Sequence, residues 1–319
     1  MPEPVPPRDP SERKADFGSI YDRADPTSYF TSLRPLRYRT PDVAAPIFRR
    51  CLAALTRQRG LARTTVLDLC CGYGANAMLV NHRMTMEELY NRFSARRLTR
   101  PVEQRIREDA EWFATWRRPV PAGQSARPRF VGIDPAGHAL NYARTTGLLA
   151  TTIEADLENA PPAQDAAASI APAVLVTVTG GMSYIGPKTF ARVLAAGSGG
   201  RRPWIATFPL RHIDVRPLAA LLKRHGYVVE PWTQYGFAHR RFADRDERTR
   251  LTAATQVAID DGADPLTWHD DRPPARDEIE AVFWLARPED EADEVPLATL
   301  VEGDGPVHEA AKAAYLGVR

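Results

Sequence analysis

The sequence predicts an α/β protein whose mostly parallel sheet carries helices on both faces. Three observations lead to this prediction. Short apolar segments alternate with helical patterns along the chain, one segment runs into a glycine-rich turn, and several end in an acidic residue. Strands that alternate with helices are joined by crossovers, and crossovers produce parallel sheets. The 319 residues are enough for one such domain with additions.

The composition is that of an ordinary globular protein, with 44% apolar and 26% charged residues. A net charge of +2 argues against a dedicated nucleic-acid-binding protein, and in Arg240–Arg248 acids interleave with arginines, as on a solvated surface. No apolar run is long enough for a membrane span, and Met1–Pro10 lacks the apolar core of a signal peptide. The three cysteines have no metal-ligand spacing and are expected to stay reduced. We therefore expect a cytoplasmic monomer or homodimer that binds no metal, nucleic acid or membrane.

The first sixty residues are expected to form a tail followed by a helical cap. Residues 1–15 are rich in proline and charge, which is typical of disorder. In the cap, residues 16–60, apolar residues recur at helical spacing behind Thr40 and Pro41. Thr is a favoured N-cap and Pro a favoured first helical residue, so a helix is predicted to begin there and to end at Gly60.

Seven apolar segments within residues 61–290 are predicted to be the strands of one sheet. They are 66–69, 130–134, 150–155, 173–179, 203–208, 227–230 and 281–286. Helical patterns are found at 75–80, 136–146, 189–196 and 215–225. Because the strands alternate with helices, the predicted domain is Rossmann-like, a mostly parallel seven-stranded sheet with helices on both faces. Residues 291–319 remain as a C-terminal extension.

The first two predicted strands are separated by far more residues than a tight connection uses. Residues 81–128 carry a capping box, Thr85-x-x-Glu88, followed by an apolar face at helical spacing. A second apolar face of the same kind lies between residues 102 and 113. Because connections in α/β units usually take only a few residues, we expect two inserted helices here.

The strongest chemical signal is the segment Val66–Gly74, which reads Val-Leu-Asp-Leu-Cys-Cys-Gly-Tyr-Gly. A strand that ends in Asp68 is followed by Gly72-x-Gly74 and then by a helix. This order brings backbone N–H groups at a helix N-terminus beside the strand tips, where open α/β sheets bind nucleotides. The glycines let the chain approach a ligand closely. A tight strand-to-helix turn without a ligand also uses glycine, so this segment alone leaves both interpretations open.

Two further acids end the next two strands. Asp134 is suited to accept hydrogen bonds from the hydroxyls of a ribose, although it is equally suited to cap the helix that begins near Ala136. Asp156 follows the third strand, where it is suited to an adenine amino group, with Leu157 against the face of the ring. Each acid is weak evidence by itself, but their order along the chain strengthens the evidence from the glycine turn for a bound nucleoside.

In this order the three elements resemble the class I S-adenosylmethionine-dependent methyltransferases, over roughly residues 60–230. The resemblance implies S-adenosylmethionine as the cofactor. The cofactor-binding residues that it implies are Asp68, Cys70, Gly72, Gly74, Asp134, Pro135, Asp156, Leu157 and Thr179. Cys70 stands where the family usually has its first glycine, which narrows the space for the methionine moiety. Minimal members of the family also lack the insertion.

A dinucleotide-binding oxidoreductase would use the same fold. Its Gly-x-Gly-x-x-Gly turn has a third glycine that allows close approach to a pyrophosphate. The turn here reads Cys-Cys-Gly-Tyr-Gly-Ala-Asn and lacks that glycine, which favours adenosylmethionine, a ligand without phosphate.

Candidate substrate-binding residues follow the fourth strand and lie in the cap. In the resembled family the tip of this strand faces the transferable methyl group, and here Gly181, Met182 and Tyr184 follow it. The Asp/Asn-Pro-Pro-Tyr/Phe motif of enzymes that methylate amino groups of nucleic acids is absent from the sequence. Tyr21 and Tyr29 are the candidates from the cap, because aromatic faces stabilise a sulfonium cation. Simple packing remains an open interpretation for Tyr184 and for the cap tyrosines.

The candidate catalytic residues are Tyr184, His212 and Tyr21. Methyl transfer from a sulfonium needs little beyond in-line placement and exclusion of water. A carboxylate acceptor needs no base, whereas a hydroxyl acceptor must lose a proton. No histidine stands at a predicted strand tip and His212 is the nearest candidate base, which favours a carboxylate or similarly acidic acceptor over a hydroxyl. We therefore expect a methyltransferase of small-molecule biosynthesis, since helical caps suit small substrates.

Two other functions stay open. The N-terminal Tyr-Asp-x-x-Asp-Pro segment joined to this core loosely resembles methyltransferase-fold enzymes that cyclise or cleave adenosylmethionine itself. Such enzymes release methylthioadenosine and a small cyclic amino acid. The third interpretation is a binding module that keeps the fold without catalysis.

Overall fold

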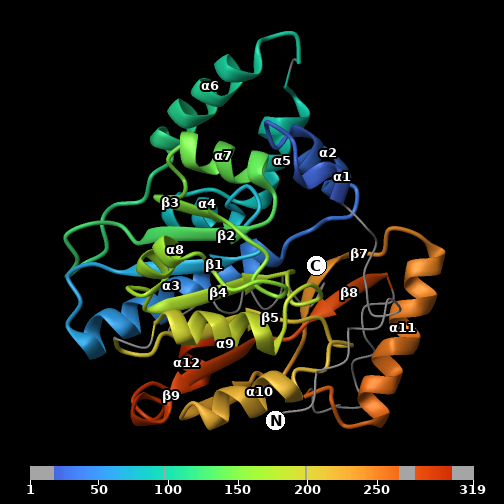
Figure 1. The fold of residues 1–319 in the computed structure, drawn as a ribbon. Helices are drawn as coiled ribbons and strands as arrows, with labels where there is room; N and C mark the ends of the chain where they lie inside the picture. The colour runs from blue at the N-terminus through green and yellow to red at the C-terminus, as the bar shows by residue number, and fades with distance from the viewer. Residues whose placement is uncertain (1–17, 97, 198–199, 266–276, 304–319) are drawn as a thin grey trace.

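The computed structural model of the protein describes residues 18–96, 98–197, 200–265 and 277–303. A central sheet is flanked by helices, with a group of helices above it and a separate two-stranded sheet with a long helix beside it (Figure 1). The predicted disordered tail, 1–15, and the end of the predicted extension, 304–319, lie outside the described residues.

The central sheet has seven strands in the order β3-β2-β1-β4-β5-β9-β6. Their bounds are Thr65–Leu69 (β1), Arg129–Asp134 (β2), Thr151–Glu154 (β3), Leu175–Thr179 (β4), Trp204–Phe208 (β5), Tyr227–Pro231 (β6) and Trp284–Pro288 (β9). The pairs from β3 to β5 are parallel, whereas β9 lies antiparallel between β5 and β6. The predicted mostly parallel, seven-stranded sheet is therefore confirmed. The strand order reverses between β1 and β4, and open α/β sheets bind ligands at such a point.

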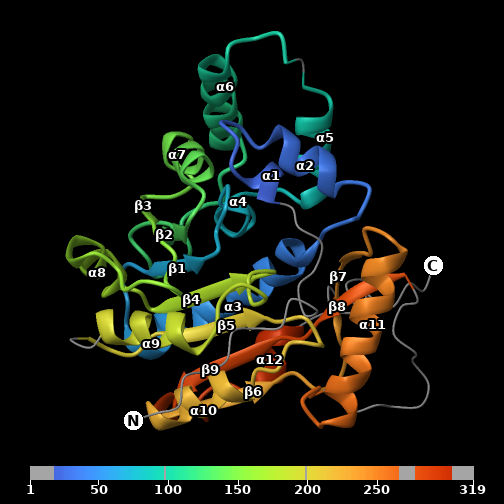
Figure 2. The same cartoon turned by 45° about the vertical axis from the view of Figure 1, so that its right-hand side comes forward.

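Helices cover both faces of the sheet, as predicted (Figures 1 and 2). One face carries α3 (Thr40–Arg59), α4 (Ala75–Asn81) and α7 (Gly137–Thr145). The other carries α8 (Gln164–Ile170), α9 (Pro187–Ala196) and α10 (Arg216–Arg224). Strands covered on both sides are largely apolar, and every residue of β5 is accordingly buried.

The helix α3 begins one residue earlier than predicted. Arg39 is its N-cap and Thr40 is already helical, so the predicted N-cap at Thr40 is wrong. The hydroxyl of Thr40 has a different partner, the Nδ1 atom of His239 at 2.7 Å. The predicted end is confirmed, because Gly60 follows the helix with a φ of +63°, in the left-handed region that suits glycine.

The predicted cap and inserted helical pair are both present and pack on each other. Of the predicted cap, residues 16–60, the helices α1 (Gly18–Tyr21) and α2 (Thr27–Leu33) lie at the insertion, whereas α3 lies on the sheet. The insertion contains α5 (Met86–Ser94) and α6 (Val102–Thr115). The Thr85 capping box forms at the start of α5, as its spacing predicts. Phe30 of α2 stacks on Phe93 of α5, with ring centroids 4.6 Å apart.

The C-terminal third differs from the prediction in two places. The single strand predicted at 281–286 is two strands, because β8 (Glu278–Ala281) ends before β9 and pairs with β7 (Phe237–Arg241) in a separate sheet. The stretch Arg240–Arg248, predicted to be solvated, contributes a fully buried ion pair between Arg240 and Glu247, with N–O distances of 2.5 and 2.8 Å. Alternating charges in a sequence do not show which of the residues form ion pairs buried in the core.

The remaining elements are α11 (Arg245–Asp260), the short 3₁₀ helix Glu289–Glu291 and α12 (Leu297–Glu302). Of the helices in the described part of the chain, none combines the length and the apolar character that a bilayer crossing requires.

Candidate functional site

The glycine turn lies at the carboxyl end of β1, beside the point where the strand order reverses. Gly72 and Gly74 have φ angles of +49° and +81°, in the left-handed region where a Cβ atom introduces strain. Gly74 is the N-cap residue of α4, so the turn delivers the chain directly into that helix. Cys70 also has a left-handed φ, of +53°, although it is not a glycine.

Asp134, at the end of β2, joins the glycine turn to the start of the next helix. Its Oδ2 atom accepts a hydrogen bond from the backbone N–H of Gly72 at 2.9 Å, and its Oδ1 atom accepts one from Ala136 at 2.9 Å. Asp134 therefore contacts the glycine turn and the residue before α7 but does not cap that helix, whose N-cap residue is Ala136 without a side-chain cap. Each carboxylate oxygen has a second lone pair, so two acceptor positions remain for a ligand. Burial raises the pKa of Asp134.

Asp68 is fully buried beneath the turn. Its Oδ1 atom accepts hydrogen bonds from Asn76 at 2.8 Å and from the hydroxyl of Thr177 at 2.7 Å. Its Oδ2 atom is buried and has no hydrogen-bond partner within the described ranges. Burial raises the pKa of Asp68 to about 7. A buried acceptor without a donor is destabilising, so the Oδ2 atom is suited to a ligand that brings a cationic donor.

The polar network continues from Asp68 to the tip of β4. The hydroxyl of Thr179 donates to the Oδ1 atom of Asn76 at 3.0 Å, and Tyr38 shares a side-chain hydrogen bond with Thr179. Burial raises the pKa of Tyr38, so its phenol stays neutral at physiological pH. Asn76 and Tyr38 were not among the predicted site residues. The position of Asn76, two residues after Gly74 in the first turn of α4, is the signal that points to it.

The predicted cap residue Tyr21 lies on the glycine turn. A Cβ atom built on Gly72 would lie 3.6 Å from Cδ1 of Tyr21, an ordinary van der Waals distance. Burial, and then the neighbouring Tyr38, Tyr184 and Asp134, raise the pKa of Tyr21. Tyr29 meets Tyr21 edge-on, with ring centroids 5.1 Å apart. The cap therefore brings a cluster of neutral phenols to the strand tips.

The loop after β4 approaches the glycine turn very closely. A Cβ atom on Gly181 would lie 2.6 Å from Cβ of Cys70, so only glycine fits this position without a shift. Met182 is buried, whereas Tyr184 is 49% exposed, so the interpretation of Tyr184 as a core aromatic is wrong. The loop is held from the other side by Glu158, whose Oε2 atom accepts the N–H of Gly186 at 2.8 Å. Glu158 is a further contributor that sequence patterns did not indicate.

The roles of three further predicted residues, Asp156, Leu157 and His212, stay predictions. Asp156 is exposed, and its carboxylate accepts hydrogen bonds within its own turn, from Glu158 N at 3.0 Å and from the side chain of Asn159 at 2.6 Å. Leu157 beside it is buried. His212 is buried on the segment after β5, and its contact with a substrate stays a prediction. The described residues contain no group of three His, Cys, Asp or Glu side chains arranged to hold a metal ion.

Comparisons with known proteins give matches in structure only. No protein-family model and no curated protein sequence matches the chain. Among similar solved structures, the plantazolicin methyltransferase BamL, solved with a triazolic desmethylPZN analogue and S-adenosylhomocysteine, is 13% identical with a TM-score of 0.38 over 87% of this chain and 96% of that chain. A methyltransferase of Geobacter sulfurreducens with S-adenosylhomocysteine is 14% identical, with a TM-score of 0.34 over 82% and 97%.

A third similar structure is the magnesium protoporphyrin IX methyltransferase of Synechocystis PCC 6803 with bound SAM, at 10% identity and a TM-score of 0.33 over 74% and 76% of the two chains. These alignments are distant, and the fold assignment comes from the sheet itself. Five strands in the order β3-β2-β1-β4-β5 are parallel, and β9 runs antiparallel between β5 and β6. The chain therefore has a Rossmann-like α/β fold with a mostly parallel seven-stranded sheet.

Proposed function

We propose that the protein is an S-adenosylmethionine-dependent methyltransferase that acts on a small molecule, with a carboxylate or hydroxyl as the acceptor. One observation carries this proposal. At the point where the strand order reverses, Asp134 holds the N–H of Gly72, and the buried Oδ2 atom of Asp68 has no donor among the described residues. A ligand with ribose hydroxyls and a cationic amino acid end suits both acids.

In this proposal each residue of the cluster has a defined role. Asp134 accepts hydrogen bonds from the ribose hydroxyls, and Asp68 accepts one from the ammonium group. The neutral ring of Tyr21 offers an aromatic face near a sulfonium. When bound, adenosylmethionine supplies a methyl group that its sulfonium already activates. Asp156 and Leu157 remain the proposed contacts of the adenine.

The tyrosines of the cluster bear on the kind of acceptor. Burial raises the pKa of Tyr21 and of Tyr38, so neither is an effective base at neutral pH. A carboxylate acceptor is already ionised and needs no base, which favours it over a hydroxyl. For a hydroxyl acceptor, His212 is the proposed base. Gly181, Met182 and the exposed Tyr184 are the proposed contacts of the acceptor.

Calorimetric titration with adenosylmethionine and with S-adenosylhomocysteine tests the cofactor assignment. Asp134→Asn should weaken both affinities by about 1–3 kcal/mol, because the amide replaces one of the accepting oxygens. Asp293→Asn, at an exposed position without a hydrogen bond to the described residues, is the matched control and should leave both affinities unchanged. Wild-type affinity in a folded Asp134→Asn protein would refute the assignment.

A product assay distinguishes the possible reactions. The protein is incubated with adenosylmethionine alone and with a panel of small carboxylic acids and alcohols, and the nucleoside products are separated by chromatography. Adenosylhomocysteine that forms only with an acceptor supports methyl transfer. Methylthioadenosine without any acceptor would instead support cleavage of adenosylmethionine itself. Neither product, together with measurable binding, would mean a binding module.

The proposal extends to the organisation of the protein. We propose residues 16–60 as the cap, 61–290 as the methyltransferase domain with its insertion at 81–128, and 291–319 as an extension. We propose that the protein is cytoplasmic and is a monomer or a homodimer. Light scattering after gel filtration measures the oligomeric state.

A further inference from the structure

Residues 22–25, which connect α1 to α2, are anchored to the elements around the glycine turn. The Oδ1 atom of Asp22 accepts the N–H of His138 at 2.8 Å, in the first turn of α7. The backbone N–H of Arg23 donates to the hydroxyl of Tyr73 at 3.0 Å, and that hydroxyl donates to the carbonyl of Arg23 at 3.0 Å. Tyr73 lies between the two glycines of the turn. The connection is therefore attached to the turn and to the helix that follows Asp134.

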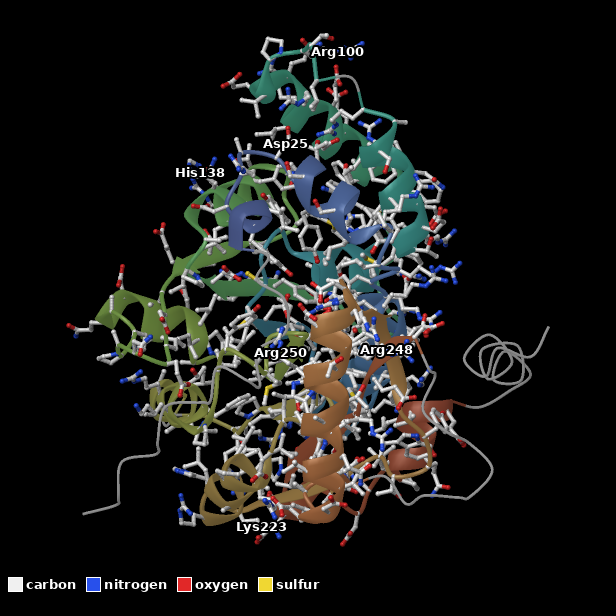
Figure 3. The ribbon with its side chains drawn as sticks, turned by 90° about the vertical axis from the view of Figure 1, so that its right-hand side faces the viewer. Asp25, Arg100, His138, Lys223, Arg248 and Arg250 are labelled. Carbon is white, nitrogen blue, oxygen red and sulfur yellow. The ribbon has the colours of Figure 1, made fainter. Side chains whose placement is uncertain are left out.

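The third anchor of this connection comes from the insertion. Asp25 is 6% exposed, and its Oδ1 atom accepts the N–H of Thr27 at 2.9 Å, at the start of α2. Its Oδ2 atom accepts two hydrogen bonds from the guanidinium of Arg105 on α6, one of them from Nε at 2.9 Å. Figure 3 shows Asp25 where the cap meets the insertion, with Arg100 at the far end of the insertion. A nearly buried ion pair thus joins the cap to the inserted helices.

A second buried acid connects the insertion to the core domain. Asp109 of α6 is fully buried and accepts hydrogen bonds from Arg92 and Arg96. Its Oδ2 atom accepts the hydroxyl of Tyr142, on α7, at 2.8 Å. The guanidinium of Arg96 also lies 4.0 Å from the carboxylate of Asp25. The insertion is therefore fixed on α7, and from that position it holds the cap.

Tyr21 makes this arrangement relevant to the site. It immediately precedes the anchored connection, and its ring lies 3.6 Å from a Cβ atom built on Gly72, so the position of α1 affects access to the glycine turn. We propose that the inserted helical pair is a clamp, in which the Asp25–Arg105 pair holds the cap closed and sets the exchange rate of the cofactor. That the ligand is adenosylmethionine rests on the proposed function. The clamp rests only on contacts within the protein and does not depend on the identity of the ligand.

The clamp is first tested without any ligand, by hydrogen–deuterium exchange of residues 18–33 followed by mass spectrometry. Arg105→Ala and Asp25→Asn should each speed exchange in this segment about 10-fold, while peptides of the central sheet stay unchanged. Asp25→Asn is the more selective variant, because asparagine can still accept the N–H of Thr27, whereas Arg105 has further bonds to the carbonyls of Leu98 and Arg100. Arg107→Ala, at an exposed position of the same helix, is the matched control.

The second measurement is the release of S-adenosylhomocysteine, followed by stopped-flow fluorescence. Both clamp variants should release it about 10-fold faster than wild type and the Arg107→Ala control, with a similar increase in the rate of binding. Exchange of residues 18–33 at the wild-type rate in both variants would overturn the clamp, whatever the protein binds. A wild-type protein that binds no adenosylhomocysteine, but whose variants show the faster exchange, would refute the proposed function and leave the clamp supported.

Discussion

Replacing Asp68 by asparagine gives a direct test of the charge at the centre of the site. The substitution retains the size of the side chain and an oxygen that can accept from Asn76 and Thr177. It removes the ionisable group whose second oxygen is buried without a donor among the described residues. Because wild type and variant differ in one titrating group, the pH dependence of the difference in stability reports on Asp68 and its coupling to neighbouring Asp134.

The sign and the size of the pH-dependent change in stability follow from the pKa of Asp68. Burial raises it from an ordinary value of 3.8 to about 7, so the folded protein binds this proton more tightly than the unfolded chain. The contribution of Asp68 to the stability of the wild type therefore falls as the pH rises from about 4 to about 7, and it is constant above that range. Between pH 5 and pH 8 the linkage relation gives a loss of about 2–3 kcal/mol, which the asparagine variant does not suffer.

The assay is urea denaturation of both proteins without ligand, at pH 5, 6, 7 and 8. The unfolding free energy of Asp68→Asn minus that of the wild type should increase by about 2–3 kcal/mol over this range. A constant cost of the new, unpaired N–H group shifts all four differences equally and does not affect the comparison. A difference that is flat with pH would refute the burial of an ionisable Asp68. In the same range, adenosylmethionine affinity should rise with pH only in the wild type.

Two other substitutions test close contacts. Glu247→Gln breaks the buried pair with Arg240 and should lower the unfolding free energy in urea by about 3 kcal/mol, whereas Arg248→Ala, at an exposed pair, should lower it by less than about 1 kcal/mol. Equal effects would contradict the burial of the pair. Gly181→Ala should cost about 1–3 kcal/mol, since its Cβ would lie 2.6 Å from that of Cys70. Cys70→Gly added to it should restore most of the thermal stability, and no restoration would show that this contact is not the source.

The parts of the fold that sequence patterns predicted are those that depend on local chemistry. Parallel strands between two layers of helices are rich in apolar and β-branched residues, and segments such as 173–179 can therefore be recognised without a structure. The Thr85 capping box and the glycine after α3 are local for the same reason, because their partners lie within a turn of the helix. The glycine turn after Asp68 belongs to this group, since its φ angles are required by the chain direction there.

The parts that escaped prediction depend on partners far away in the sequence. Arg240 and Glu247 look like any other members of a charged stretch until β7 packs against the core and buries them. Tyr38 becomes a neighbour of Thr179 only because the chain before α3 pairs with β7, where Arg39 donates to the carbonyl of His239. In contrast, Asp156 stood in the expected place, but its carboxylate is engaged in its own turn, an alternative that short polar side chains always have.

Cys70 and Gly181 together explain how the turn accommodates its departure from the resembled family. A left-handed φ of +53° costs a residue with a Cβ about 1 kcal/mol, so the side chain must be accepted by its surroundings. Its sulfur lies 4.0 Å from the carbonyl oxygen of Gly181, and any side chain at Gly181 would collide with it. The side chain of Cys70 thus occupies space beside the loop after β4, and this space is free because Gly181 has no side chain. Contrary to the prediction that Cys70 narrows the space for the methionine moiety, we therefore expect Cys70→Gly to leave the calorimetric affinity for adenosylmethionine nearly unchanged. The substitution should act on the acceptor side, by loosening the loop that carries Met182 and Tyr184.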